Sequence, residues 1–396
     1  MQIKTLDRPT SHLREALVDG EVASWLTVID YQMRVGSSVV KMGAISDTYT
    51  KARFRMKGCM RTLIEDTLAY LANGGYAMSV VTGIPNFYYH FGYASGVPDR
   101  TFKVPTFVAE EAGNSGRPGR FRVRKARKAD SERLVAVYDH YTRGTMCALA
   151  RDAEFFAGFD GAGQRVVVAE DEAGGVVGYA VYAKASGDRR MREVAAEHDM
   201  RVTEVAAVEP EACPALMGAL ARVAMRWRVG DIVLSLAPDE PFAEFCQRYG
   251  GQWNMIYRKN SHTMVRIIDQ QALFRAMLPD LARRIRYSEF ADGSARLTLK
   301  TDIGRTTFSI DKGALELNTA GKEGSVVELS QAQLAQVVVG YRSARDALAE
   351  AGARASDRVQ RLLAVLFPPG YPRLWRGRRF EERGVGYRPD REPPER

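Results

Sequence analysis

The chain has 396 residues, 45% of them hydrophobic and 27% charged, which is typical of a folded globular protein of about two to three domains. It has no apolar run of about 18 residues and no apolar leader segment, so we expect no membrane span and a cytoplasmic location. The net charge of +9 favours an anionic partner, and without a nucleic-acid-binding motif a phosphate-rich cofactor is preferred to nucleic acid. The four cysteines form no CxxC pair, which disfavours a metal site or a disulfide framework.

The first predicted elements are strands. Residues 13–35 form a hairpin whose turn is Asp19-Gly20, a strong short-range hairpin signal. A further strand follows near residues 39–50 and ends in a basic loop. Residues 58–73 form a helix, because apolar residues recur there at spacings of 3, 4, 7 and 8. Another strand is expected over residues 76–82.

The middle of the chain repeats this order. An aromatic segment, Gly83–Tyr93, is followed after one more strand by residues 110–119, whose Gly, Ser, Pro and charged residues predict a linker. Past the linker come a strand and helix from Phe121, a hairpin over 165–184, a strand over 202–208, a helix over 214–226 and a strand over 231–236. The repeated order indicates an internal duplication.

A third block begins near Met264 with a strand entering a helix. Residues 295–318 form three short strands, and residues 329–343 form a helix with Ser330 as its N-cap. The last residues, 381–396, are charged and rich in Pro and Gly, which predicts a tail.

The segment SDTYTKARFRMKGCM carries the strongest chemical signal. A strand ends, a basic loop passes Gly58, and a helix begins. Unpaired N–H groups and the positive end of the helix dipole favour a phosphate at such a turn. Arg53, Arg55 and Lys57 add positive charge. From spacing alone, a plain solvent-exposed basic loop that caps a helix is the favoured interpretation.

This segment resembles the acyl-CoA motif of the GNAT family of N-acyltransferases, R/Q-x-x-G-x-G/A. Arg55 and Gly58 match the motif, whereas Met60 replaces its final small residue and Met56 follows the arginine where relatives often have glycine. The resemblance implies acetyl-CoA as co-substrate and no metal. It places the pantetheine arm and the pyrophosphate on two neighbouring runs of residues: Thr48, Tyr49 and Thr50, and Arg55, Met56, Lys57, Gly58 and Cys59.

The aromatic segment GIPNFYYHFGY resembles that of the Eis (enhanced intracellular survival) acetyltransferases, in which tandem GNAT-like regions precede a sterol-carrier-protein-like domain. The resemblance implies that Tyr88 is the general acid, whereas sequence alone favours a half-buried core tyrosine with a satisfied hydroxyl. It implies an α/β (α+β) fold of tandem mixed sheets flanked by helices. The implied division is an acyl-CoA domain at 1–109, a linker at 110–119, a second GNAT-like domain at 120–263, a sterol-carrier-like domain at 264–380 and a tail at 381–396.

Two departures from the Eis pattern concern the ends of the chain. The base in that group is a C-terminal carboxylate on an aromatic residue that corresponds to Phe380, but here the chain continues. The alternatives are Glu381, Glu382, a water molecule, or a tail that moves aside. The strand and two helices that precede the hairpin in a complete GNAT fold are expected to be missing. The second region, with EPEACPALMGAL at its turn, is acidic where phosphates need cations, so we expect it to bind no CoA.

The favoured hypothesis is an acetyl-CoA-dependent N-acetyltransferase that transfers acetyl directly, in a ternary complex, to a primary amine of a small molecule or peptide. Asp30, Asp47 and Glu65 are candidate acidic groups for a cationic acceptor, and Trp25 is a candidate lining residue. The alternative is a non-catalytic scaffold that binds CoA or a hydrophobic ligand, and a nucleic-acid partner ranks third. The resemblance also implies a homo-oligomer, commonly a hexamer in this group.

Overall fold

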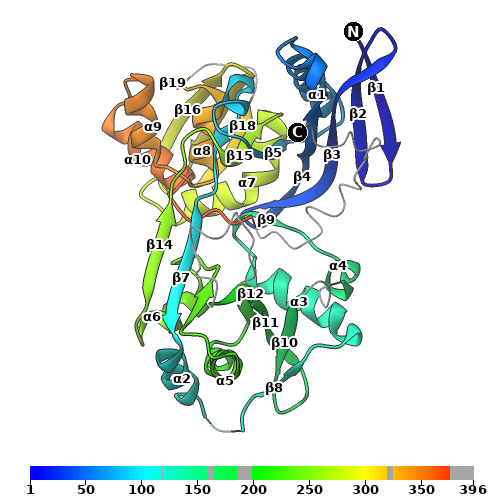
Figure 1. Ribbon diagram of the computed structural model, residues 1–396. Helices are drawn as coiled ribbons and strands as arrows, with labels where there is room; N and C mark the ends of the chain where they lie inside the picture. The colour runs from blue at the N-terminus through cyan, green and yellow to red at the C-terminus, as the bar shows by residue number, and fades with distance from the viewer. Residues whose placement is uncertain (118, 159–163, 185–198, 319–323, 375–396) are drawn as a thin grey trace. The chain divides into compact units, whose positions relative to one another are not determined.

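The computed structural model describes five stretches of the chain, residues 1–117, 119–158, 164–184, 199–318 and 324–374. The chain divides into two compact units (Figure 1). The first unit contains Met1–Gly96 and Lys259–Pro369, and the second contains Val97–Arg258 and residues 370–374. Each unit is therefore assembled from segments far apart in the sequence, whereas sequence analysis divided the chain into consecutive segments.

The main sheet of the first unit has the strand order β1-β2-β3-β4-β5-β15-β6. Its strands are β1 (Gln2–Arg8), β2 (Ser11–Val18), β3 (Glu21–Val35), β4 (Ser38–Thr50), β5 (Met78–Gly83), β15 (His262–Ile267) and β6 (Ala94–Ser95). Neighbouring strands are antiparallel except β4 and β5, which are parallel. The predicted hairpin turn is confirmed: Asp19 and Gly20 both have positive φ, as a two-residue hairpin turn of the favoured type requires.

The expectation that no strand precedes the hairpin is wrong, because β1 pairs with β2 from Gln2↔Leu17 to Arg8↔Ser11. The sequence signal was weak because β1 is an edge strand with few apolar residues, and its burial pattern is mostly exposed.

The helix predicted at residues 58–73 is confirmed as α1 (Cys59–Asn73). It packs against β2, β3 and β4, as the blue ribbons of Figure 1 show. Its buried face carries Leu63, Ile64 and Leu71, which join the core under the sheet. Gly58, with φ of 81°, precedes the helix, and Gly74 follows it.

The remainder of the first unit is built around a smaller sheet with the order β18-β17-β16-β19. Its strands are β16 (Ser294–Thr301), β17 (Gly304–Asp311), β18 (Ala314–Asn318) and β19 (Ser325–Glu328). The helices here are α7 (Gln270–Arg286), α8 (Gln331–Val338), α9 (Ala344–Ala351) and α10 (Asp357–Leu366). Phe274, Phe308 and Phe367 meet in its core.

Ser330 caps α8 as predicted, through a reciprocal capping box with Gln333. The helix ends at Val338 and not at residue 343, because Gly340 has a φ of 81° and Ser343 already caps α9.

The second unit has one sheet with the order β14-β7-β13-β12-β11-β10-β8. Its strands are β7 (Asp99–Pro105), β8 (Arg122–Lys125), β10 (Arg165–Glu170), β11 (Val176–Lys184), β12 (Met200–Ala207), β13 (Asp231–Leu234) and β14 (Gln252–Ile256). A short strand, β9 (Met146–Leu149), also belongs to this unit. The helices are α2 (Thr106–Asn114), α3 (Ser131–Tyr141), α4 (Ala153–Ala157), α5 (Cys213–Trp227) and α6 (Pro241–Gln247).

The segment predicted as a linker is partly helical, because α2 extends to Asn114. Ala109 and Ala112 are buried, and α2 packs closely on α5 where Gly113 faces Gly218. The glycines and charged residues that suggested a linker therefore serve a close helix–helix contact and the exposed face of α2.

Candidate functional site

The candidate site lies where β4 and β5 part. Their parallel pairing runs from Met42↔Met78 to Ile45↔Val81, and β4 continues beyond it to Thr50. On its other side, the register between β3 and β4 shifts between Trp25 and Thr27, so that Asp47 and Thr48 together face one residue of β3. Asp47 has a φ of 48°, which is typical of an inserted bulge residue. The bulge re-aims the side chains of β4 at the point where its parallel partner ends.

Thr48 and Tyr88 are in direct contact at this point. The Thr48 Oγ1 lies 3.0 Å from the phenol oxygen of Tyr88, which belongs to a short 3-10 helix, Tyr88–Phe91. Tyr88 is 3% exposed. Burial raises the pKa of Tyr88, and the hydrogen bond with Thr48 opposes that rise. The phenol is therefore a protonated group at neutral pH.

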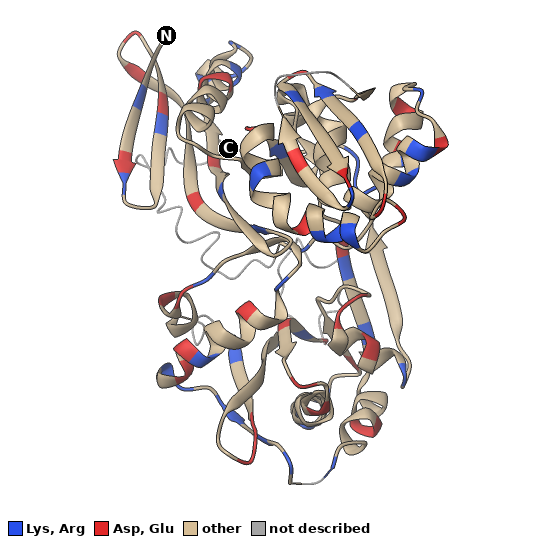
Figure 2. Ribbon diagram, turned by 180° about the vertical axis from the view of Figure 1, so that it is seen from behind, with Lys and Arg blue, Asp and Glu red and all other residues tan. Residues whose placement is uncertain are grey.

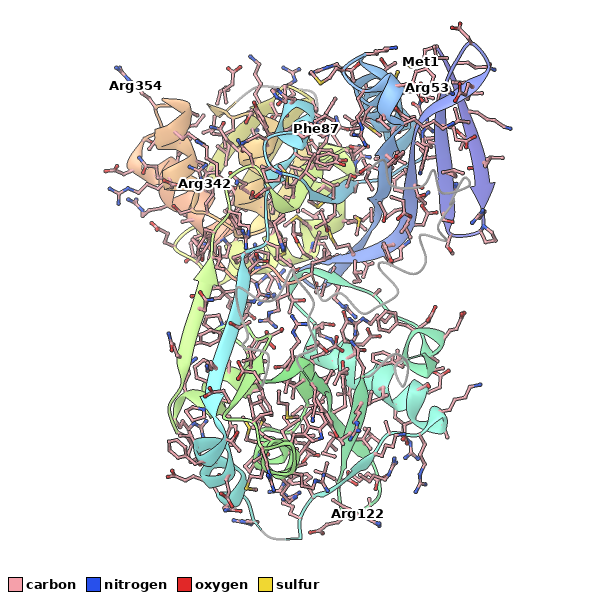
Figure 3. All side chains as sticks on the ribbon, in the orientation of Figure 1. Met1, Arg53, Phe87, Arg122, Arg342 and Arg354 are labelled. Atoms are coloured by element: carbon pink, nitrogen blue, oxygen red, sulfur yellow. The ribbon has the colours of Figure 1, made fainter. Side chains whose placement is uncertain are left out.

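The ring of Tyr88 is held by close packing. A Cβ at Gly83 would lie 2.7 Å from the Tyr88 ring and 2.9 Å from the sulfur of Met264, so only glycine fits there. Phe87, labelled in Figure 3, makes an edge contact with the ring at 5.0 Å between centroids. Tyr93 makes a second edge contact at 6.1 Å. These contacts leave the hydroxyl end directed toward β4.

The loop from β4 to α1 presents free backbone donors. No side chain caps the first turn of α1, and that turn contains no acidic residue. A Cβ at Gly58 would meet nothing within 4 Å, so the backbone at Gly58 is open to approach. An uncapped, open helix start of this kind fits an anionic group.

Charge in this loop is unevenly neutralised. Glu21 pairs with Lys51 at 3.0 Å and also with Arg53, which is labelled in Figure 3. Arg55 donates from Nε to the carbonyl of Thr50 at 3.3 Å, and within the described part of the chain neither Arg55 nor Lys57 pairs with a carboxylate. Over both units Lys and Arg are interspersed with Asp and Glu (Figure 2), so the concentration of cations around Arg55 is a local feature.

The other predicted CoA-contacting residues lie along the same strand and loop. Tyr49 is 42% exposed and its ring packs against that of Trp25 in a tilted arrangement, with the centroids 4.6 Å apart. The Thr50 hydroxyl lies 3.0 Å from that of Ser24. Met56 is fully exposed with a φ of 60°, whereas Cys59 is buried at the start of α1. The structure thus brings Thr48 and Tyr88 together and places the loop residues at the end of the same strand.

The candidate acidic residues have different surroundings. Asp30 accepts a hydrogen bond from Tyr76 at 2.5 Å and contacts His12 at 3.2 Å, so it belongs to a separate polar cluster. Glu65 is exposed on α1. Asp47 lies beside Thr48, where desolvation raises the pKa of its carboxyl. Phe380, Glu381 and Glu382 lie outside the described residues.

The corresponding turn of the second unit differs in its chemistry. There β12 leads through a 3-10 turn, Pro210–Ala212, into α5. Pro214 lies in the first turn of α5 and has no N–H to donate. Glu209 and Glu211 place two carboxylates beside the turn. This turn offers fewer donors and more negative charge than the loop at Gly58.

Sequence reasoning missed several residues that shape the site. They are Gly83, Glu21 and Ser24. Each contacts a residue distant in the sequence (Met264, Lys51 and Thr50, respectively), and no local motif reveals such a contact. The described residues contain no group of three or more His, Cys, Asp or Glu placed to hold a metal ion. Among the helices the structure describes, none has the length and apolar character needed to cross a membrane.

Comparison with known families gives two matches in tandem. One family model described as an acetyltransferase (GNAT) domain matches residues 7–96, and a second model of the same description matches residues 147–267. A search of curated proteins by sequence gave no significant match.

Solved structures with related architecture span nearly the whole chain. A GCN5-related N-acetyltransferase from Kribbella flavida is 19% identical, with a TM-score of 0.70 over 93% of this chain and 88% of that chain. A probable N-acyltransferase from Enterococcus faecalis is 16% identical, with a TM-score of 0.72 over 93% and 89%. Eis1 from Mycobacterium abscessus is 18% identical, with a TM-score of 0.62 over 92% and 89%. The predicted fold class, tandem GNAT-type mixed sheets flanked by helices, is confirmed.

Proposed function

From two GNAT acetyltransferase regions in tandem, we propose that this chain is an acetyl-CoA-dependent N-acetyltransferase of the Eis type. The acceptor is a primary amine of a small molecule or peptide, and transfer is direct, within a ternary complex. The observation that carries the proposal is the 3.0 Å contact between Thr48 and Tyr88 at the point where β4 and β5 part. It places a protonated phenol beside the strand that leads to the open helix start at Gly58.

In this proposal acetyl-CoA binds along one continuous path. The backbone of Thr48, Tyr49 and Thr50 pairs with the pantetheine arm. The segment 55–59 holds the pyrophosphate through the N–H groups at the start of α1 and the charge of Arg55 and Lys57. The open backbone at Gly58 and the absence of an acidic residue in the first turn of α1 support this assignment.

The chemistry follows from the protonation state of Tyr88. The amine nitrogen attacks the thioester carbonyl and gives up one proton to the base, the carbon–sulfur bond breaks, and the departing thiolate takes the phenol proton of Tyr88. The raised pKa of Tyr88 keeps that proton on the oxygen until the thiolate forms. Either hydroxyl can donate across the Thr48–Tyr88 contact. In the proposed reaction Thr48 is the donor, which leaves the phenol hydrogen free for the sulfur. A proton from solvent then restores the phenol.

The proposal extends to the rest of the chain by resemblance to the Eis group. Residues 1–109 carry the acyl-CoA chemistry, 110–119 connect to a GNAT-like region at 120–263 that binds no CoA, and 264–380 form a sterol-carrier-like domain followed by a tail. The protein is cytoplasmic and self-associates, as a hexamer in the simplest case. Glu381, Glu382 or water serves as base in place of a carboxylate on Phe380.

A thiol-reagent assay of CoA release tests the proposal, with acetyl-CoA and a panel of polyamines as acceptors. We expect wild type to turn over and Tyr88→Phe to lower kcat about 100-fold or more, the usual range for loss of a general acid. Tyr89→Phe is the matched control, because Tyr89 is the next residue of the same turn and is 40% exposed. Its kcat should stay near that of wild type.

Two further measurements separate the alternatives. If a chain ending at Phe380 releases CoA faster than the full chain, the new C-terminal carboxylate is assigned as the base. If no form turns over but acetyl-CoA still raises the melting temperature, the protein is a CoA-binding scaffold. If the protein shows no turnover and acetyl-CoA causes no thermal shift, both the enzyme and the CoA site are rejected.

A further inference from the structure

Two side chains from distant parts of the first unit hold the end of the turn that carries Tyr88. Arg266, on β15, donates from Nη1 to the carbonyl of Phe91 at 2.5 Å. Gln331, the first residue of α8, donates from Nε2 to the carbonyl of Gly92. We call Arg266 and Gln331 the carbonyl clamp. They follow the turn by 175 and 239 positions in the sequence.

Gln331 is itself fixed from two sides. Its Oε1 accepts a hydrogen bond from the backbone N–H of Ile267 at 3.2 Å, on β15. Its own backbone N–H donates to Asp302 at 2.6 Å. The residue is 1% exposed, so its amide has one available orientation that satisfies both partners. It therefore transmits the position of α8 and β15 to the Tyr88 turn.

Gly92 is required for the clamp to close. It has a φ of 75°, and a Cβ at this position would collide with Nη1 of Arg266 and Nε2 of Gln331. Only a glycine both adopts this conformation readily and leaves room for the two donors. Three residues from separate segments thus meet at one point of the backbone.

The clamped carbonyls are connected to Tyr88 by short backbone hydrogen bonds. The N–H of Gly92 donates to the carbonyl of Tyr89 at 3.0 Å, and the N–H of Tyr93 donates to the carbonyl of Tyr88 itself at 3.3 Å. A shift of Gly92 therefore moves the backbone of Tyr88. The phenol oxygen, 3.0 Å from Thr48, moves with it.

We propose that Gln331, together with Arg266, is a positioning residue for Tyr88, so that the carboxy-terminal part of the first unit sets the geometry of proton donation. This proposal rests on the proposed function, in which Tyr88 is the proton donor. The clamp bonds the backbone of the turn at Phe91 and Gly92, so it acts on Tyr88 through the turn. Its loss should lower kcat more than it changes the KM for acetyl-CoA, because the described hydrogen bonds of Gln331 reach Gly92, Ile267 and Asp302 and not the loop at Gly58.

The test compares Gln331→Met with Gln336→Met, alone and combined with Tyr88→Phe. Gln336 lies on the same helix and also donates its amide to a backbone carbonyl, that of Ser95 at 2.8 Å, which is outside the Tyr88 turn. We expect Gln331→Met to lower kcat about 10-fold in the wild-type background, since a misplaced reacting group costs roughly this or more. In the Tyr88→Phe background it should cause no further loss. Gln336→Met should leave kcat within about twofold in both backgrounds.

A second variant removes only the donor. Gln331→Glu keeps the acceptor for Ile267 but removes the donor to Gly92, so it should resemble Gln331→Met in kcat. Equal losses of kcat in both Tyr88 backgrounds would mean that Gln331 is only structural, and no loss from Gln331→Met would overturn the proposal directly.

A measurement without turnover separates this proposal from the proposed function. In protein labelled with ¹³C at the tyrosine Cζ, the Tyr88 resonance is identified by its absence in Tyr88→Phe. It should shift in Gln331→Met and stay in place in Gln336→Met. If wild type is inactive and this resonance shifts as expected, the acetyltransferase function fails while the positioning contact stands. An unchanged resonance in Gln331→Met overturns the positioning contact whatever the activity.

Discussion

The hydroxyl of Thr48 is the group on β4 that meets the Tyr88 phenol, and the bulge at Asp47 is what brings it there. Two opposing influences act on the phenol. Burial disfavours the phenolate and raises the pKa, whereas the hydrogen bond from Thr48 favours the phenolate. The position of β4 thus tunes how readily Tyr88 gives up its proton.

Replacing Thr48 by Val tests this balance. Without the Thr48 hydrogen bond the phenolate loses its partner, so the pKa of Tyr88 should rise further. The activity lost as Tyr88 ionises at alkaline pH should then be lost at higher pH in Thr48→Val than in wild type, as measured by the pH dependence of kcat. Thr67→Val, which removes a buried hydroxyl bonded within α1, is the control and should leave that alkaline limb in place. A shift toward lower pH in Thr48→Val would contradict the assignment.

At the level of elements, α2 and α5 of the second unit approach each other closely at a pair of glycines. Gly113 on α2 faces Gly218 on α5 with no side chain between the two backbones. Such an approach buries Ala109 and Ala112 of α2 in the core shared with α5. The tightness is asymmetric: a Cβ at Gly113 would collide with the backbone of Gly218, whereas one at Gly218 has its nearest neighbour 3.3 Å away.

Gly113→Ala should therefore be more destabilising than Gly218→Ala. Backbone atoms cannot move aside as a side chain can, so we expect a loss of about 1–3 kcal/mol of unfolding free energy for Gly113→Ala. At Gly218 the smaller clash is offset by the better helix propensity of Ala, worth about 1 kcal/mol. Thermal unfolding of the two variants measures the difference. Equal melting temperatures would show that the helices separate freely.

Sequence patterns predicted those elements that are determined by residues close together in the chain. The apolar spacing within α1, the Asp19-Gly20 turn and the Ser330 cap each depend on residues a few positions apart, and all three are present. The edge strand β1 and the helical part of 110–119 were missed because exposed, polar or glycine-rich sequence hides regular structure. Tyr88 and Thr48 could be nominated by resemblance, but Arg266 and Gln331 could not, since their contacts span 175 and 239 positions.

Across the whole molecule, the two units are interleaved in sequence. The main sheet of the first unit is completed by β15, which follows the entire 97–258 segment and lies between β5 and β6. Val265 and Met264 of β15 are fully buried there. The first 96 residues alone therefore lack an interior strand of their own sheet, the one that pairs with β5.

A fragment ending at residue 109 should consequently fail to fold by itself. Without β15, β5 becomes an exposed edge and the Tyr88 turn loses its packing against Met264. We expect no cooperative thermal transition from this fragment, and recovery of one when residues 259–369 are co-expressed as a second chain. The same second chain carrying Val265→Asp should not restore it. A cooperative transition in the 1–109 fragment alone would contradict the expectation.

The place of β15 in the chain also orders events during synthesis. At about 5–20 residues per second, roughly 10–30 s pass between the emergence of the first 96 residues from the ribosome and that of β15. For that interval the nascent amino-terminal segment carries an unpaired β5 edge, which is a target for chaperones and for other nascent chains. The second unit is made almost completely in the meantime. The part of the protein that carries the proposed catalytic groups is thus translated first and finishes folding last.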